Sequence, residues 1–197
     1  MNIACTFKRK IQLMKRILLL LTTVFSISLS AQEVNLESSN LKWSGSDVVG
    51  KTHFGSLSFS KADLQISNGD ITGGAFEIDM TTLKVEDLTG EWAEKLAGHL
   101  SSDDFFSIDK FEKAFLILTD VAKLRDGSFH AKGDLTIKGI TQPTEVHFTS
   151  NGTSGYNATM TFNRAKFDVR FRSGTFFENL GDKLILDDIK LEATLAF

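Results

Sequence analysis

The chain has 197 residues, with 22 lysines and arginines against 25 aspartates and glutamates, and a formal net charge of −3. Its single cysteine, Cys5, precedes an apolar run near the N-terminus, so a chain processed after that run has no disulfide, thiolate metal site or cysteine nucleophile. Binding to nucleic acids or to anionic lipid surfaces is favoured by a basic patch, which an acidic chain is not expected to have. We therefore expect no nucleic-acid partner.

Residues 1–31 have the pattern of a secretory signal peptide. Five basic residues precede an apolar run of thirteen residues at 17–29, which is shorter than the ~20 residues that span a bilayer. We predict cleavage after Ala31 and a periplasmic or secreted protein, whether translation starts at Met1 or at Met14. Loss of the five basic residues changes the net charge from −3 to −8.

Residues 32–197 are predicted to form one domain. These 166 residues contain no repeat, low-complexity tract or linker, and they suffice for a hydrophobic core without disulfides. The chain has seventeen phenylalanines against one tyrosine and two tryptophans. Because phenylalanine has no polar atom, an interior rich in it excludes water and favours apolar ligands.

The first predicted element is a hairpin. Apolar and polar residues alternate over 57–66 and again over 76–80, which is typical of half-buried strands. Asn68-Gly69 between them is a strong signal for a two-residue turn. Gly73-Gly74 interrupts the second strand and indicates a bulge or a close approach of backbones.

A helix is predicted near residues 90–100. Leu88, Trp92, Leu96 and Leu100 recur every four residues, and acidic residues occupy the first turn. A short turn of helix or a tight loop is expected to follow at Asp103-Asp104-Phe105-Phe106.

The rest of the chain again predicts strands. Residues 113–124 carry apolar side chains on both faces, so we expect a strand that is covered on both sides, with the helix outside. Asp126-Gly127 predicts a second hairpin turn. Alternation over 129–137 leads to a connection at 139–143 that contains the single proline, and the last strand alternates strictly over 189–197.

Seven to nine strands at regular spacing with one inserted helix predict a mainly β protein, either a closed antiparallel barrel or a sandwich. A barrel of ~8 strands has an interior that holds packed side chains or one small ligand.

No catalytic or metal site is predicted. The chain has no G-x-S-x-G elbow and no Ser-x-x-Lys in a cleft-forming context. Its four histidines lack the spacing of metal motifs. His99 with Asp103 or Asp104 is the best local pair, but we expect His99 to cap the helix end.

Two pairs of carboxylates could be imagined as acid–base pairs. Glu77 and Asp79 share the polar face of a strand and are predicted to face water, while Asp187-Asp188 is predicted to be a turn. Neither pair is expected in the dry cleft that acid–base catalysis requires, so we predict that the protein is not an enzyme.

The candidate ligand-binding residues are two phenylalanine doublets and one arginine. Phe105-Phe106 and Phe176-Phe177 are consistent with ordinary core packing or with side chains that line or gate an apolar cavity. Arg164, Arg170 and Arg172, which precede the second doublet, are expected to be solvated strand charges. One at the barrel rim, for which we name Arg164, could meet a polar or phosphate head group.

Residues 34–197 resemble the YceI-like domain family. The resemblance rests on His99-Leu100-x-Ser102-x-Asp104-Phe105-Phe106 and on Gly133-Asp134-Leu135-Thr136-Ile137-Lys138-Gly139-Ile140-Thr141-x-Pro143, with Asn163-Arg164-x-x-Phe167 later. It implies an all-β (mainly) fold, a closed antiparallel lipocalin-like β-barrel of about eight strands with one inserted short helix. It also implies exported proteins, often dimeric, that bind polyisoprenoids or related long-chain amphiphiles without catalysis or cofactor.

These observations favour an exported protein that sequesters a long-chain isoprenoid or fatty amphiphile inside a β-barrel, and the resemblance adds a homodimer as an expectation. The first alternative is a structural or stress-response barrel with a packed interior that binds no ligand. A metal-dependent enzyme is a distant third.

Overall fold

The computed structural model describes residues 30–152 and 155–197, with the backbone alone described for Ser30–Glu33. The predicted signal peptide lies outside the described residues except at its last two positions, and it stays a prediction. The elements are β1 (Ser30–Glu33), β2 (Asn40–Asp47), β3 (Thr52–Ser67), β4 (Asp70–Val85), α2 (Glu91–Ser101), β5 (Lys113–Lys123), β6 (Phe129–Ile137), β7 (Ile140–Ser150), β8 (Gly155–Asn163), the 3₁₀ turns η1 (Arg164–Phe167) and η2 (Gly181–Lys183), and β9 (Ile185–Ala196).

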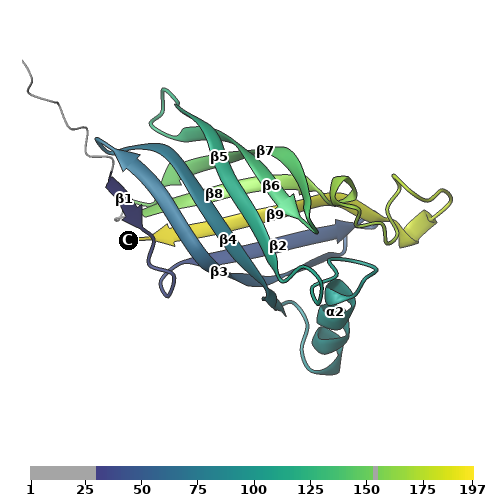
Figure 1. The fold of residues 1–197 in the computed structure, drawn as a ribbon. Coiled ribbons are helices and arrows are strands. Elements are labelled where there is room, and N and C mark those ends of the chain that lie inside the picture. Colours follow the sequence, from purple (N-terminus) through teal and green to yellow (C-terminus); the bar gives the residue numbers. More distant parts are fainter. Residues whose placement is uncertain (1–29, 153–154) are drawn as a thin grey trace, which may run out of the picture.

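Strands β2 to β9 form a closed antiparallel barrel (Figure 1). Neighbours follow the order β3-β2-β9-β8-β7-β6-β5-β4, and β4 pairs back to β3 to close the ring. The short strand β1 adds to the half of β3 nearest the β3–β4 turn. The predicted eight-stranded barrel with one inserted helix is therefore confirmed.

Two-residue turns at the hairpins follow from local sequence. Asn68 and Gly69 have φ values of 52° and 83°, and Ser67 pairs directly with Asp70. Lys138 and Gly139 repeat this geometry between β6 and β7, with φ values of 51° and 73°. Both are turns with two left-handed residues, whose twist matches that of the flanking strands.

Strand β7 begins at Ile140, so the connection predicted at 139–143 is wrong. Pro143 lies inside the strand, opposite Asp134 of β6. Because Ile140 closes a two-residue turn, alternate pairing turns the proline nitrogen away from β6. On the other edge, pairing with β8 begins only at His147. The proline therefore costs no ladder hydrogen bond.

Strand β5 is covered on one face rather than two. Ala114, Leu116 and Leu118 are buried in the barrel, whereas Phe115 and Ile117 are 38% and 55% exposed on its outside. The prediction of a second covered face is wrong because α2 packs across the end of the barrel beside β4 (Figure 1).

The barrel interior is filled most tightly at the end that carries the Asn68-Gly69 turn. There Leu64 and Ala131 have no exposed surface, and Leu195 has 1%. A second cluster of buried residues, with Trp43 and Phe105 among them, lies at the opposite end beneath α2. The looser packing lies between these two regions, and it leads to the candidate site.

Candidate functional site

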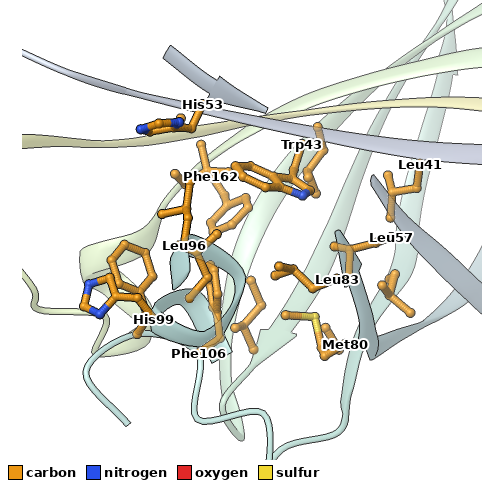
Figure 2. A pocket seen from close by; sticks show the side chains of 18 of the residues that line it. Leu41, Trp43, His53, Leu57, Met80, Leu83, Leu96, His99, Phe106 and Phe162 are labelled. Carbon is orange, nitrogen blue, oxygen red and sulfur yellow. The ribbon is translucent and has the colours of Figure 1, made fainter. Parts of the chain in front are cut away.

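An apolar cavity of about 130 Å³ lies inside the barrel at the end covered by α2 (Figure 2). Its walls come from the inward-facing positions of the strands, from α2 and from the loop after α2, because period-two alternation brings every second side chain inward. The lining residues are Leu41, Trp43, Gly45, His53, Leu57, Ile78, Met80, Leu83, Leu96, His99, Leu100, Phe105, Phe106, Ala114, Leu135, Ile137, Phe162, Ile185, Ile189 and Leu191.

A second apolar cavity of about 50 Å³ lies deeper in the barrel. Its lining residues are Leu41, Phe59, Phe76, Ile78, Leu116, Leu135, Val146, Phe148, Ala158, Thr159, Met160, Leu191, Ala193 and Leu195. We call the two spaces the outer and the inner cavity. Four aliphatic side chains border both, so the cavities follow one another along the barrel; they are Leu41, Ile78, Leu135 and Leu191.

Two polar groups that border the outer cavity, the Trp43 indole and the His53 ring, form hydrogen bonds at its wall. The indole N–H of Trp43 donates to the carbonyl oxygen of Lys84 over 3.1 Å. His53 Nδ1 lies 2.7 Å from Asp87 Oδ2, and the other Asp87 oxygen accepts the backbone N–H of Phe54. These contacts join β2 to β4 and β3 to the segment that leads to α2, leaving a mostly carbon surface toward the cavity.

The Asp87 carboxylate is held in its ionised form. Burial raises its pKa, but hydrogen bonds from the Phe54 N–H and from His53 outweigh this effect, so the pKa lies below its ordinary value of 3.8. The charge of Asp87 is therefore part of what fixes the start of the α2 segment at neutral pH.

His99 packs among aromatic rings instead of capping the helix. Its ring meets Phe171 and Phe105 edge-on, at centroid distances of 4.4 and 5.5 Å, and its Nε2 is buried without a hydrogen-bond partner. The backbone N–H and hydroxyl of Ser102 bind the carbonyl of His99 and cap the helix in its place.

The best local candidate for a metal pair, His99 with a nearby acid, does not form, since His99 Nε2 has no hydrogen-bond partner. Asp103 lies 2.7 Å from Lys110, whose hydrogen bond lowers the pKa of the Asp103 carboxyl. His130 and His147, distant in sequence, are register partners on β6 and β7. Within residues 30–152 and 155–197, no three His, Cys, Asp or Glu side chains are grouped so as to hold a metal ion.

The doublet Phe105-Phe106 lines the outer cavity, as one of the two sequence interpretations expected. Phe105 is 4% exposed and Phe106 is half-buried, and their rings meet edge-on at 5.5 Å. Whether either ring contacts a ligand stays a prediction.

The doublet Phe176-Phe177 lies elsewhere, in the loop between η1 and β9. The two side chains are 39% and 49% exposed, and neither lines the outer or the inner cavity. The guanidinium of Arg170 lies 5.1 Å from the ring centre of Phe176. The structure therefore does not bring the two doublets together, and a ligand-binding role for the second doublet stays a prediction.

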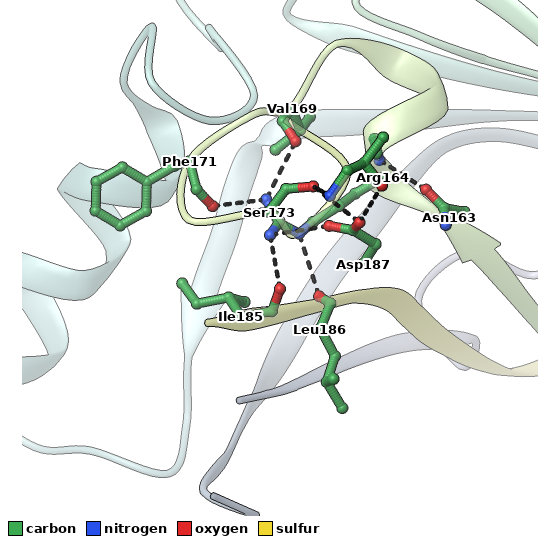
Figure 3. Close-up of polar contacts among 10 residues, drawn as sticks. Asn163, Arg164, Val169, Phe171, Ser173, Ile185, Leu186 and Asp187 are labelled. Carbon is green, nitrogen blue, oxygen red and sulfur yellow. Dashed lines mark hydrogen bonds and ion pairs between the residues drawn. The ribbon is translucent and has the colours of Figure 1, made fainter. Parts of the chain in front are cut away.

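Arg164 is fully buried, so the expectation of a solvated strand charge is wrong for this residue (Figure 3). Its guanidinium forms an ion pair of 3.1 Å with Asp187 and lies 5.3 Å from the ring centre of Phe105. Four backbone carbonyls accept its N–H groups at 3.0–3.2 Å, those of Val169, Phe171, Ile185 and Leu186. With its donors used in this way, Arg164 holds the loop and supports the cavity wall from behind.

The partner of Arg164 was missed by sequence reasoning. Asp187 lies in strand β9, not in the predicted turn, and it also accepts hydrogen bonds from the hydroxyls of Ser173 and Thr175 at 2.8 Å. It has the same strand phase as the cavity-lining Ile185 and Ile189. An acid at an inward-facing position requires a cationic partner, and this signal could have revealed the pair.

Of the other carboxylate pair, Glu77 binds Lys113 and the hydroxyl of Ser60 on the outside of the barrel. The hydrogen bond from Lys113 is the largest cause of its lowered pKa. This is the opposite of the raised pKa that a general acid needs. In the described part of the chain, no helix has the length and hydrophobicity to cross a membrane.

A closed eight-stranded antiparallel barrel with an apolar interior and one helix across its end defines a lipocalin-like β-barrel domain. The model of the YceI-like domain family matches residues 25–197, and the chain belongs to this family.

The curated relatives carry family-level names. A UPF0312 protein of Staphylococcus aureus (strain USA300) is 30% identical over 155 residues, covering 71% of this chain and 82% of that protein. A UPF0312 protein of Pseudomonas putida (strain F1) is 32% identical over 97 residues, covering 45% of this chain and 50% of that protein.

Two solved structures share the fold. Burkholderia cenocepacia BcnA has a TM-score of 0.66 at 16% identity, covering 83% of this chain and 98% of that chain. A polyisoprenoid binding domain from Saccharophagus degradans, implicated in plant cell wall breakdown, has a TM-score of 0.52 at 12% identity, covering 83% and 95%. At these identities the likeness shows the fold alone.

Proposed function

We propose that the protein is an exported binding protein, not an enzyme, that holds the hydrocarbon tail of a long-chain isoprenoid or similar amphiphile inside its barrel. The observation that carries this proposal is the outer cavity, because its lining is aliphatic and aromatic, with Trp43 and His53 hydrogen-bonded at the wall and His99 Nε2 left as one buried polar atom without a partner. A hydrocarbon tail on such a surface is removed from water, whereas a polar solute finds few hydrogen-bond partners there. The polyisoprenoid binding domain among the structural neighbours supports this class of ligand. Export rests on the signal-peptide pattern of residues 1–31.

The size of the cavities constrains how a tail is held. The outer cavity of about 130 Å³ compares with the ~150 Å³ apolar cavity that takes up benzene, and lies below the ~300–1,000 Å³ of drug-sized pockets. A long tail therefore has to displace lining side chains. Met80, whose unbranched side chain has three rotatable bonds, can move with little strain.

A second candidate function is that of a structural or stress-response barrel with a packed interior. The small cavity volumes and the dense packing around Leu64 and Ala131 favour it. The two candidates differ in whether the interior ever holds a molecule other than protein.

Organic extraction and mass spectrometry of the purified, processed protein test the proposal. We expect about one single-tailed lipid per chain, absent from an Ala114→Phe variant because the added ring fills the outer cavity next to buried Ala114. Ala75→Phe, on the exposed outer face of β4, is the matched control and should retain the lipid. Absence of lipid from the wild-type protein would favour the packed-interior candidate, and equal retention by both variants would place the lipid outside the barrel.

A further inference from the structure

We infer that the barrel accepts one hydrocarbon tail, and that Ala158 and Ala193 at the bottom of the inner cavity determine how long that tail can be. This inference rests on the proposed function. It concerns the inner cavity, of whose lining residues only Leu135 lies in a sequence motif of the family.

A tail that extends from the outer into the inner cavity has to pass between the side chains that separate them, and this passage would admit a single chain. Its walls are the four aliphatic side chains shared by the two cavities, and they come from β2, β4, β6 and β9, which surround the interior (Figure 2 labels Leu41). Packed carbon atoms approach to ~3.5–4.0 Å, so a ring of four side chains around a narrow barrel leaves room for one tail at most. A lipid with two tails does not fit through this ring.

The inner cavity exists because two alanines are neighbours. Ala158 of β8 and Ala193 of β9 are register partners, so their side chains point inward side by side. The next inward positions on these strands are filled by larger residues, with Met160 opposite Leu191. The space that two large side chains would occupy is thus left open at this one level of the barrel.

The inner cavity is also the end of the path. Phe59, Phe76 and Phe148 line it, and beyond them Leu64 has no exposed surface and Leu195 has 1%. A tail that enters from the α2 end and passes the ring of four therefore stops against this packed region. The polar end of such a ligand remains near the α2 end, where His53 and His99 border the outer cavity.

The test uses the delipidated protein and a series of straight-chain fatty alcohols of increasing length. For the wild-type protein we expect the dissociation constant to fall about fourfold per added methylene, the ratio that burial of one CH₂ provides, until the tail reaches the end of the path. Beyond that length the constant should level off. A two-tailed lipid with chains of the same length should not bind.

The informative variant is Ala193→Leu, compared with Ala75→Leu on the outer face of β4 as the matched control. Leucine adds three carbon atoms to the inner cavity, so the affinity should level off about three methylenes sooner, while short alcohols bind as before. If Ala193→Leu fails to fold, Ala193→Val gives a smaller shift in the same direction. An unchanged length dependence in a folded variant would overturn the inference while leaving the proposed function intact. Failure of the wild-type protein to bind any alcohol would instead contradict the proposed function.

Discussion

Arg164 shows how a single buried charge organises the end of the barrel. Its guanidinium has no exposed surface, pairs with Asp187 and donates to four carbonyls of the segments on either side. Burial lowers the pKa of Arg164, and the Asp187 carboxylate opposes this shift. Removing one member of such a pair leaves the other charge buried without compensation, which is the costly case.

We therefore expect Arg164→Met to lower the free energy of unfolding by about 3–5 kcal/mol in chemical denaturation. The control is Arg170→Met, because the Arg170–Asp168 pair has side chains that are 60% and 45% exposed. Exposed pairs contribute at most about 1 kcal/mol. Equal losses for the two variants would mean that Arg164 does not hold the loop as described.

A second prediction concerns Phe106, which lines the outer cavity and is only half-buried. Because a ring beside a cavity has fewer protein neighbours to lose, Phe106→Ala should cost less than the ~3–5 kcal/mol of a core Phe→Ala change. Phe129, which is 3% exposed and lines neither cavity, gives the core reference. Lipid binding should weaken in Phe106→Ala but not in Phe129→Ala molecules that remain folded. A loss as large as that of Phe129→Ala, with binding unchanged, would make Phe106 part of the scaffold.

A third prediction concerns pH. The folded pKa of Asp87 lies below its ordinary value of 3.8, so its ionised form contributes stability that is present above that value and is lost as the pH falls through the folded pKa. The difference in unfolding free energy between the wild-type protein and Asp87→Asn should therefore be constant near neutral pH and shrink below pH 3.8. Denaturation across this range measures it. A difference independent of pH would show that the charge of Asp87 contributes nothing.

Among the secondary-structure elements, the sequence predicted best the turns and bulges, because these depend on residues adjacent in the chain. Asn68-Gly69 supplies the two left-handed positions of its turn, and Asp126-Gly127 lies in the longer connection between β5 and β6, with Gly127 at a φ of 85°. Gly73-Gly74 marks both a register shift and a close approach, since a Cβ on Gly74 would lie 3.0 Å from the Asp63 carbonyl oxygen. These features need no knowledge of the rest of the fold.

The predictions that failed concern features that depend on how the helix and the strands pack against one another. Trp92 continues the apolar spacing of α2 yet is 70% exposed, because the helix contacts the barrel end through Leu96 and Leu100. The outward Phe115 and Ile117 likewise suggested a cover that the position of α2 does not provide. Of the candidate site, the position of the doublet Phe105-Phe106 beside an apolar cavity could be predicted, because the doublet lies in the loop directly after the helix. The strand phase of Asp187 could have indicated a buried acid, whereas the identity of its partner, Arg164, required the structure.

The closure of the barrel between β3 and β4 gives a fourth prediction. Gly55 lies between Trp43 on β2 and Val85 on β4, and a Cβ there would overlap the carbonyl oxygen of Lys84. Gly55→Ala should therefore separate β3 from β4, break the hydrogen bond from the Trp43 indole to the Lys84 carbonyl and lower the melting temperature. The control is Gly98→Ala on α2, where a Cβ meets no atom within 4 Å and alanine gains up to ~1 kcal/mol of helix propensity. A Gly55→Ala protein as stable as the wild type would contradict this account of the closure.

The whole molecule combines a closed barrel, a tightly packed end at the β3–β4 turn and an apolar interior that begins beneath α2. The two tryptophans report on different parts of it, since Trp43 lines the outer cavity and Trp92 is 70% exposed on α2. In a Trp92→Phe variant, Trp43 is the single indole, and its fluorescence reports what occupies the cavity.

The most direct test is titration of the delipidated Trp92→Phe protein with a single-chain fatty alcohol brominated along its tail, a probe that quenches tryptophan on contact. The account predicts saturable quenching of Trp43 at one probe per chain, competed by the unbrominated alcohol and removed by Ala114→Phe. If Trp43 is not quenched, while the exposed Trp92 is quenched in a Trp43→Phe protein of preserved fold, the tail does not enter the barrel and the central claim is wrong.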